Sequence, residues 1–104
     1  MANIVWSYKA FEDYKAIVEF IAKDSEKYAS LTAKKIWKEI KRIEQNPMEA
    51  RMVPEAGYLE NIREFILGQY RIIFQLKGDI AYLLTIHYNS RNLKKKSLLG
   101  KLRK

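Results

Sequence analysis

Residues 61–91, NIREFILGQYRIIFQLKGDIAYLLTIHYNSR, decide the fold, because three β-prone runs are separated there by two glycine-containing dipeptides. Gly68-Gln69 and Gly78-Asp79 each supply a residue that tolerates the positive φ of a tight turn between antiparallel strands. The stretch therefore predicts a three-stranded antiparallel meander, and the turn positions allow its register to be worked out.

If each turn has two residues, Leu67 pairs with Tyr70 and Lys77 with Ile80, and alternation sorts the side chains onto two faces. The first face is almost wholly apolar and is predicted to receive helices; it holds Phe65, Leu67, Tyr70, Ile72, Phe74, Leu76, Ala81, Leu83, Thr85 and His87. The second face mixes aliphatic and hydrogen-bonding groups, as a working surface or a partner's contact site does; it holds Ile62, Glu64, Ile66, Arg71, Ile73, Gln75, Lys77, Ile80, Tyr82, Leu84, Ile86 and Tyr88.

The residues before the meander predict one short strand and two helices. A β-prone run covers residues 3–8, and Ser7 can cap a helix that its apolar spacing extends from residue 9 to about 23. A second amphipathic pattern follows the capping side chains of Asp24-Ser25 and runs to about Gln45, where Asn46-Pro47 ends it. A short turn between two such helices predicts an antiparallel hairpin packed on the apolar face of the sheet.

These elements define an α+β domain in which an N-terminal strand and an antiparallel helical hairpin pack on a curved, mainly antiparallel sheet, in the order β-α-α-β-β-β. At 104 residues the chain is expected to form one domain over residues 1–91, with a basic C-terminal tail at 92–104. The irregular segment 46–60 is a loop with a short extended piece at 51–55, whose Arg51 and Glu55 are candidate functional residues or a surface ion pair.

The composition excludes several classes of protein and site. There is no cysteine and only one histidine, so a disulfide framework, a thiol nucleophile and a Cys- or His-rich metal site are not expected. No glycine-rich phosphate loop is present, and neither a cofactor nor a metal is predicted. The chain has no signal-peptide pattern and no apolar run of about 18 residues, which favours a cytoplasmic protein that does not enter a membrane.

The net charge of +8 is unevenly distributed along the chain. Residues 92–104 hold six Lys and Arg with no acidic residue, whereas residues 1–91 hold 14 basic and 12 acidic side chains. Leu98, Leu99 and Leu102 would form one apolar stripe in a helix, so the tail is expected to dock or fold when a partner binds. The basic side chains of the second helix are expected to form a solvated face paired with Glu39 and Glu44.

A small set of polar residues on the second face could support chemistry. Arg71 lies across from Glu64, Tyr88 ends the last strand, and Glu55 and Arg91 are predicted nearby. Arginine can hold a phosphate or a carboxylate, tyrosine can stack on a base, and glutamate can accept a proton, so the set could cleave RNA. An ion-paired rim around a protein interface is an equally good interpretation.

His87 is predicted among core residues, where a lone histidine is usually structural. It is nevertheless a candidate catalytic residue, together with Arg71, Tyr88 and Glu55.

Particular residues of the chain resemble the RelE/ParE toxins of bacterial type II toxin-antitoxin modules. The resemblance lies in RMVPEAGYLENIREFILGQYRIIFQL followed by DIAYLLTIHYNSRNL, with Trp6, Ala10, Ile17 and Asn46-Pro47 fitting upstream, over roughly residues 4 to 93. It implies the same β-α-α-β-β-β fold and a toxin neutralised by a cognate antitoxin. The antitoxin's binding segment is expected to be acidic.

The sequence motifs IRE and YRII are closer to those of the ParE branch, whose members inhibit DNA gyrase by binding and have no known catalytic site. Ile62 and Glu64 stand where RelE carries lysines, and Glu64 would repel a phosphate. The alternative implied is a ribosome-dependent mRNA endoribonuclease of RelE or YoeB type using Arg71, Glu55 and Tyr88 or His87. A third is an inactive binding module. Residues expected to contact the target or partner are Glu64, Arg63, Arg91, Lys94, Lys95, Lys96, Lys101 and Arg103.

Overall fold

The computed structural model describes residues 1–56 and 61–88. Its elements in chain order are β1 (Asn3–Trp6), α1 (Tyr8–Ala22), α2 (Glu26–Gln45), the 3-10 turn η1 (Pro47–Glu49), β2 (Arg51–Met52), the 3-10 turn η2 (Pro54–Ala56), β3 (Ile62–Leu67), β4 (Tyr70–Lys77) and β5 (Ile80–Tyr88). The predicted α+β class and element order are confirmed, and the predicted extended piece is β2. Arg91 and the basic tail lie outside the described residues.

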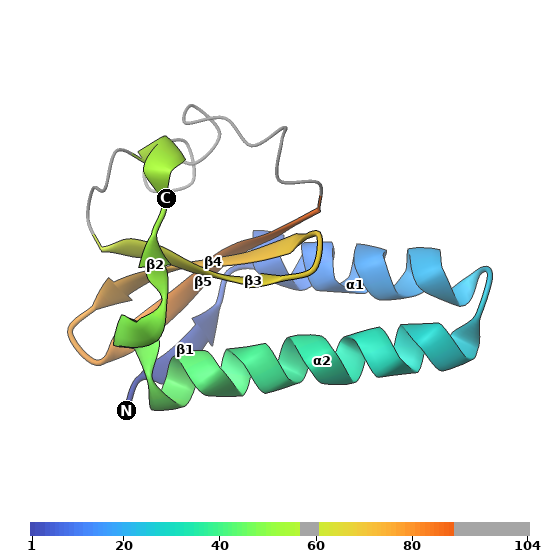
Figure 1. Ribbon diagram of the computed structural model, residues 1–104, viewed down its shortest axis with the longest axis horizontal. Coiled ribbons are helices and arrows are strands. Elements are labelled where there is room, and N and C mark those ends of the chain that lie inside the picture. The colour runs from blue at the N-terminus through green and yellow to red at the C-terminus, as the bar shows by residue number, and fades with distance from the viewer. Residues whose placement is uncertain (57–60, 89–104) are drawn as a thin grey trace.

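Five strands form one sheet in the order β1-β5-β4-β3-β2. β1 runs parallel to β5, whereas the other neighbouring pairs are antiparallel. The predicted turns are confirmed, since Leu67 faces Tyr70 and Lys77 faces Ile80, with φ of 60° at Gly68 and 57° at Gly78. The hairpin of α1 and α2 covers one face of the sheet and extends past its end (Figure 1).

Each helix begins at a serine whose side chain supplies the missing hydrogen-bond acceptor. Ser7 Oγ accepts the backbone N–H of Ala10 at 3.0 Å, and Ser25 Oγ accepts that of Tyr28 at 3.1 Å. The apolar spacing of α2 then turns its buried side chains toward the sheet; these are Ala29, Ile36, Ile40 and Ile43. In the described residues, neither helix is long and apolar enough to cross a bilayer.

The two capping serines are expected to differ in their contribution to stability. Ser7 Oγ is half-buried and also donates to the backbone oxygen of Leu84 in β5 at 3.1 Å, whereas Ser25 only caps its helix. Ser7→Ala is therefore expected to lower the free energy of unfolding by about 2 kcal/mol and Ser25→Ala by about 1 kcal/mol. Urea unfolding of both variants checks this, and equal losses would show that the contact with β5 contributes nothing.

One residue of β5 overturns part of the predicted face assignment. Phe74 pairs with Leu83 but Ile73 pairs with Thr85, so Leu84 is the extra residue of a β-bulge. Beyond it Ile86 and Tyr88 pair with Ile72 and Tyr70 on the helix-covered face, whereas Thr85 and His87 pair with Ile73 and Arg71. The predicted faces of these four β5 residues are therefore wrong, because alternation in a sequence does not reveal an inserted residue.

Helix α1 completes the edge of β5 where β1 stops. The ladder between the two strands ends at Trp6 opposite Leu83. The carboxylate of Asp13 in α1 accepts the backbone N–H of Ile86 at 3.1 Å and the hydroxyl of Thr85. These bonds satisfy polar groups that would otherwise be buried without a partner, so the helical hairpin is fixed to the sheet by polar contacts as well as by its apolar face.

Candidate functional site

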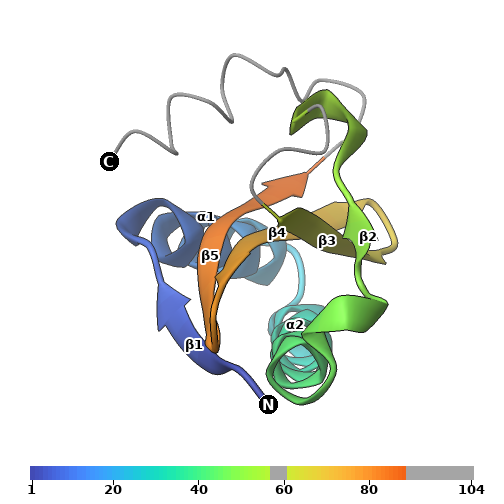
Figure 2. The same ribbon diagram turned by 90° about the vertical axis from the view of Figure 1, so that its left-hand side faces the viewer.

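The face of the sheet opposite α1 and α2, called the far face here, is partly covered by the residues that follow β2, from Val53 to Ala56. Figure 2 shows β2 and η2 at the side of the sheet remote from α1. Val53 N donates to Ile62 O at 3.0 Å, and the segment's apolar side chains pack on the sheet in a second small core that consists of Val53, Ala56, Ile62, Ile73 and Leu84. The segment is therefore a packed layer of the fold.

Four charged side chains of alternating sign lie on this face and are called the arginine-glutamate chain. Arg51 Nε donates to Glu64 Oε2 at 2.5 Å, and Arg71 Nε donates to Glu64 Oε1 at 2.5 Å. Arg71 Nη1 and Nη2 hold the two oxygens of Glu55 at 2.6 and 2.8 Å. The side chains of Arg71 and Glu64 are 3% and 0% exposed, against 28% for Glu55 and 59% for Arg51. The arginine-glutamate chain thus begins at the exposed Arg51, continues through the buried Glu64 and Arg71, and ends at the partly exposed Glu55.

Strand register explains how these residues meet. Glu64 in β3 lies opposite both Arg51 in β2 and Ile73 in β4. Arg71 stands two positions before Ile73, so it is the diagonal neighbour of Glu64 on the same face. The turn η2 then carries Glu55 over β4. The predicted pairing of Arg71 with Glu64 is confirmed, whereas Arg51 binds Glu64 and not Glu55.

Mutual hydrogen bonding favours the charged forms of Glu55 and Arg71. The hydrogen bond from Arg71 lowers the pKa of Glu55, against the opposing effect of burial, and the same bond raises the pKa of Arg71. A carboxylate with a lowered pKa is a weak base at neutral pH, so Glu55 is poorly suited to general base catalysis. The guanidinium of Arg71 directs its Nε and both Nη groups to carboxylates, and its fork geometry already serves Glu55.

Acid is expected to weaken the fold through Glu55. Because its pKa is lowered on folding from an ordinary value of 4.5, its stabilising effect is fully present above that pH and is lost as the pH falls through the folded-state pKa. Glu55→Gln should therefore destabilise the protein at pH 7 and make little difference at pH 2 to 3. Thermal melts between pH 2 and 7 test this, with Glu19→Gln on the exposed face of α1 as the control. A constant difference between wild type and Glu55→Gln across that range would contradict it.

Tyr88 does not join this site. It lies on the helix-covered face, where its ring meets that of Tyr70 at 5.2 Å beside a hollow of about 350 Å³ that also includes Thr32, Lys35, Leu67, Gly68 and Gln69. Burial raises the pKa of the Tyr70 phenol. The structure therefore separates Tyr88 from Arg71 and Glu55.

His87, predicted in the core, is instead half-buried and opposite Arg71 in the register. Arg63, a predicted contact residue, makes a hydrogen bond within the domain, since its Nη1 donates to Ala50 O at 2.8 Å. The remaining predicted contact residues lie outside the described part of the chain; these are Arg91, Lys94, Lys95, Lys96, Lys101 and Arg103. Residues 1–56 and 61–88 contain no group of three or more acidic, histidine or cysteine side chains that could hold a metal ion.

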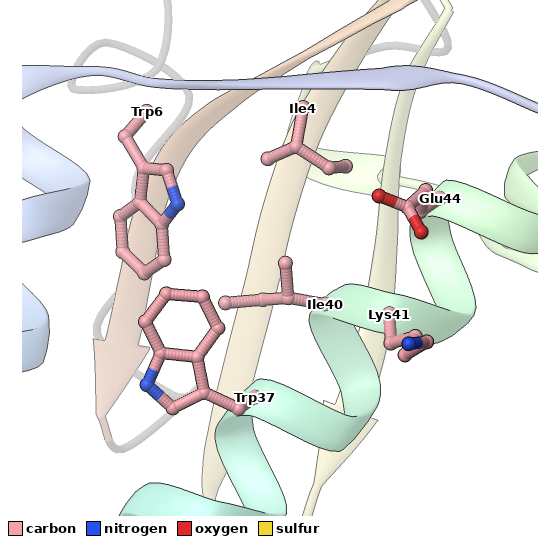
Figure 3. A pocket seen from close by; sticks show the side chains of 6 residues that line it. All are labelled: Ile4, Trp6, Trp37, Ile40, Lys41 and Glu44. Atoms are coloured by element: carbon pink, nitrogen blue, oxygen red, sulfur yellow. The ribbon is translucent and has the colours of Figure 1, made fainter.

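A second surface feature was not predicted from the sequence. Figure 3 shows a hollow of about 290 Å³ between β1 and α2, lined by Ile4, Trp6, Trp37, Ile40, Lys41 and Glu44. The rings of Trp6 and Trp37 lie 5.4 Å apart, and Trp37 Nε1 donates to the hydroxyl of Tyr14 at 2.9 Å. Trp37 is half-exposed, and the one sequence signal of this hollow is the presence of a tryptophan on each of the two elements that line it.

Comparison with known proteins gives a consistent result. The family model described as "ParE toxin of type II toxin-antitoxin system, parDE" matches residues 4–93. The solved structure titled "Chromosomal ParDE TA system from P. aeruginosa" has a similar fold, with a TM-score of 0.69 at 21% identity over 85% of this chain and 96% of that chain. A search of curated proteins found no match.

Proposed function

Since the chain belongs to the family of ParE toxins of type II toxin-antitoxin systems, we propose that it inhibits growth by binding DNA gyrase and that a cognate antitoxin neutralises it. The observation that carries the proposal is the engagement of Arg71. Its side chain is buried and bound to both Glu55 and Glu64. An arginine held in this way stabilises the far face and is poorly placed to take up a phosphate.

The same geometry speaks against the endoribonuclease alternative. RNA cleavage by general acid-base chemistry needs its groups around one reacting atom. Here Arg71 is bound to carboxylates, Glu55 has a lowered pKa, and Tyr88 lies on the other face of the sheet. Among the described residues, His87 is the one remaining candidate opposite Arg71, and that arginine is already bound to two carboxylates, which favours a toxin that acts by binding.

The hollow between β1 and α2 supports an antitoxin contact. β1 is an edge strand of the sheet, its Val5 side chain is exposed, and the half-exposed Trp37 stands beside it. An extended or helical segment of an antitoxin could place apolar side chains in the hollow and acidic ones near Lys41. Gyrase and a cognate antitoxin would both be met in the cytoplasm, so the proposal places the chain there.

Expression in bacterial cells tests the proposal. The expected result is induction of a DNA-damage reporter and loss of supercoiling of a plasmid, both suppressed by co-expression of the antitoxin. Cleavage of mRNA at ribosomes, mapped by primer extension, without a DNA-damage response would support the nuclease alternative and contradict the proposal. Growth at the normal rate with soluble toxin present would instead indicate an inactive binding module.

A further inference from the structure

Four lysines form a row on the outward side of α2, here called the lysine stripe. They are Lys27, Lys34, Lys38 and Lys41. Their spacings of seven, four and three residues place them on one side of a helix, opposite the direction in which Ile36 and Ile40 are buried. All four are exposed. In Figure 2, where α2 is seen nearly end on, this helix lies at the outside of the molecule.

The lysine stripe is not neutralised within the described residues. Its four ammonium groups form no salt bridge with any carboxylate of residues 1–56 and 61–88, whereas Arg42 on the same helix binds Glu39 at 3.4 Å and Glu49 at 3.5 Å. The prediction that Glu39 and Glu44 pair with the basic face is therefore wrong for these lysines. No acidic residue occurs between Lys27 and Lys38 in the sequence, so the stripe presents charge of one sign.

The positive charge of this surface is local to α2. Residues 1–91 hold nearly equal numbers of basic and acidic side chains. Glu64 is fully buried, and the Asp13 carboxylate is largely buried where it binds the edge of β5. Because Glu64 is buried together with Arg71 and Asp13 is paired with Lys9, these acids change the surface charge little, and the positive charge over α2 comes from its own exposed lysines.

We propose that the lysine stripe binds the phosphate backbone of a nucleic-acid duplex without reading its sequence. From Lys27 to Lys41 the helix rises about 21 Å, and a duplex carries one negative charge per roughly 1.7 Å of its axis. The stripe therefore faces many phosphates at once. Lysine binds a phosphate as a point charge, which gives affinity without base specificity.

The surroundings of the stripe favour a duplex over a single strand, an amphipathic helix or a membrane surface. Single strands bind by stacking their bases on aromatic rings set among the cations, whereas the exposed rings of α2, Tyr28 and Trp37, lie to either side of the lysine stripe and not within it. Tyr28 and Leu31 are exposed on one side of the stripe and Trp37 on the other, so no continuous apolar face is present to anchor an amphipathic helix or a membrane surface. The half-exposed Trp37 faces the hollow beside β1 (Figure 3).

This inference goes beyond the proposed function and does not depend on it. A contact with a duplex would bring a gyrase-binding toxin to the DNA on which gyrase acts, but the inference stands on charge and exposure alone. It can be measured without gyrase, so failure of one proposal leaves the other intact.

The test measures binding of the full chain to two unrelated 20-base-pair DNA duplexes by fluorescence anisotropy across a range of salt concentrations. The stripe variant is Lys27→Glu, Lys34→Glu, Lys38→Glu, which leaves Lys41 of the hollow unchanged. The matched control is Lys15→Glu, Lys23→Glu, Lys77→Glu, which changes the net charge equally at exposed positions elsewhere. The stripe variant should bind both duplexes about tenfold or more weakly at 50 mM salt, and the slope of log K against log salt should fall by about 2 to 3.

Equal losses in the stripe and control variants would overturn the inference, because they would show a response to net charge only. An unchanged salt slope in the stripe variant would also overturn it, as would intact duplex binding accompanied by loss of antitoxin binding. Circular dichroism confirms folding. If the charge-reversed variant fails to fold, the same three lysines are changed to glutamine, and the slope is again expected to fall while that of the matched glutamine control does not.

Discussion

Replacing Arg71 with alanine is expected to lower the free energy of unfolding by about 3 to 5 kcal/mol. The substitution leaves the carboxylate of Glu64, which is fully buried, without its most deeply buried cationic partner. It also frees Glu55 from the sheet, and with it the contact that holds η2 over β4. Chemical denaturation in urea measures the change, read from the midpoint at constant m-value.

Three companion variants make this result specific. Arg51→Ala removes the exposed end of the arginine-glutamate chain and should reduce stability by no more than about 1 kcal/mol. Arg71→Lys should recover little, since an ammonium cannot reproduce the bonds to two carboxylates. The double change Arg71→Met, Glu64→Met should be far milder than Arg71→Ala, because it leaves no unpaired buried charge. A loss below about 1 kcal/mol for Arg71→Ala would contradict a structural role for the arginine-glutamate chain.

Phe74→Ala is expected to reduce stability by about 3 to 5 kcal/mol as well. Phe74 lies at the centre of β4, is 0% exposed, stacks on Phe65 at 6.4 Å and faces Leu83. Truncating its ring opens a cavity between the sheet and the helical hairpin. In a domain of this size the melting temperature should fall by more than about 12 °C.

Phe20→Ala is the matched control for the core variant. The side chain of Phe20 is 71% exposed on α1, so removing the same atoms there should change stability by less than about 0.5 kcal/mol. Calorimetry or a thermal melt compares the two. Similar losses at both positions would contradict the assignment of the core to the interface between β4 and the helices.

The fold could be predicted from the sequence because its signals are local. Gly68 and Gly78 mark turns whose positive φ leaves few alternatives, and Ser7 and Ser25 begin the helices as their side-chain chemistry predicts. The apolar period of α2 is confirmed for its buried residues, which are Ala29, Ile36, Ile40 and Ile43, whereas Trp37 is half-exposed. The resemblance to RelE/ParE toxins rested on residues that the family comparison also covers.

The site was harder to predict, because a β-bulge and the packing of a loop do not show in the alternation of side chains along a sequence. The bulge at Leu84 moves Tyr88 and His87 to opposite faces from those that alternation assigned. The pairing of Arg71 with Glu64 was foreseen, since both lie in strands of known register. The burial of that pair was not, because it depends on how the segment from Val53 to Ala56 folds over the far face. Nothing in that segment's own sequence shows where it packs.

Gyrase inhibition and RNA cleavage through Arg71 can be measured side by side with the same purified chain. The most direct measurement adds the purified chain to purified DNA gyrase in a supercoiling assay, and in parallel to translating ribosomes carrying a defined mRNA. A toxin that acts by binding gyrase should inhibit supercoiling in a dose-dependent way, reversed by the antitoxin, and leave the mRNA intact. Cleaved mRNA on the ribosomes with gyrase activity undiminished would contradict it.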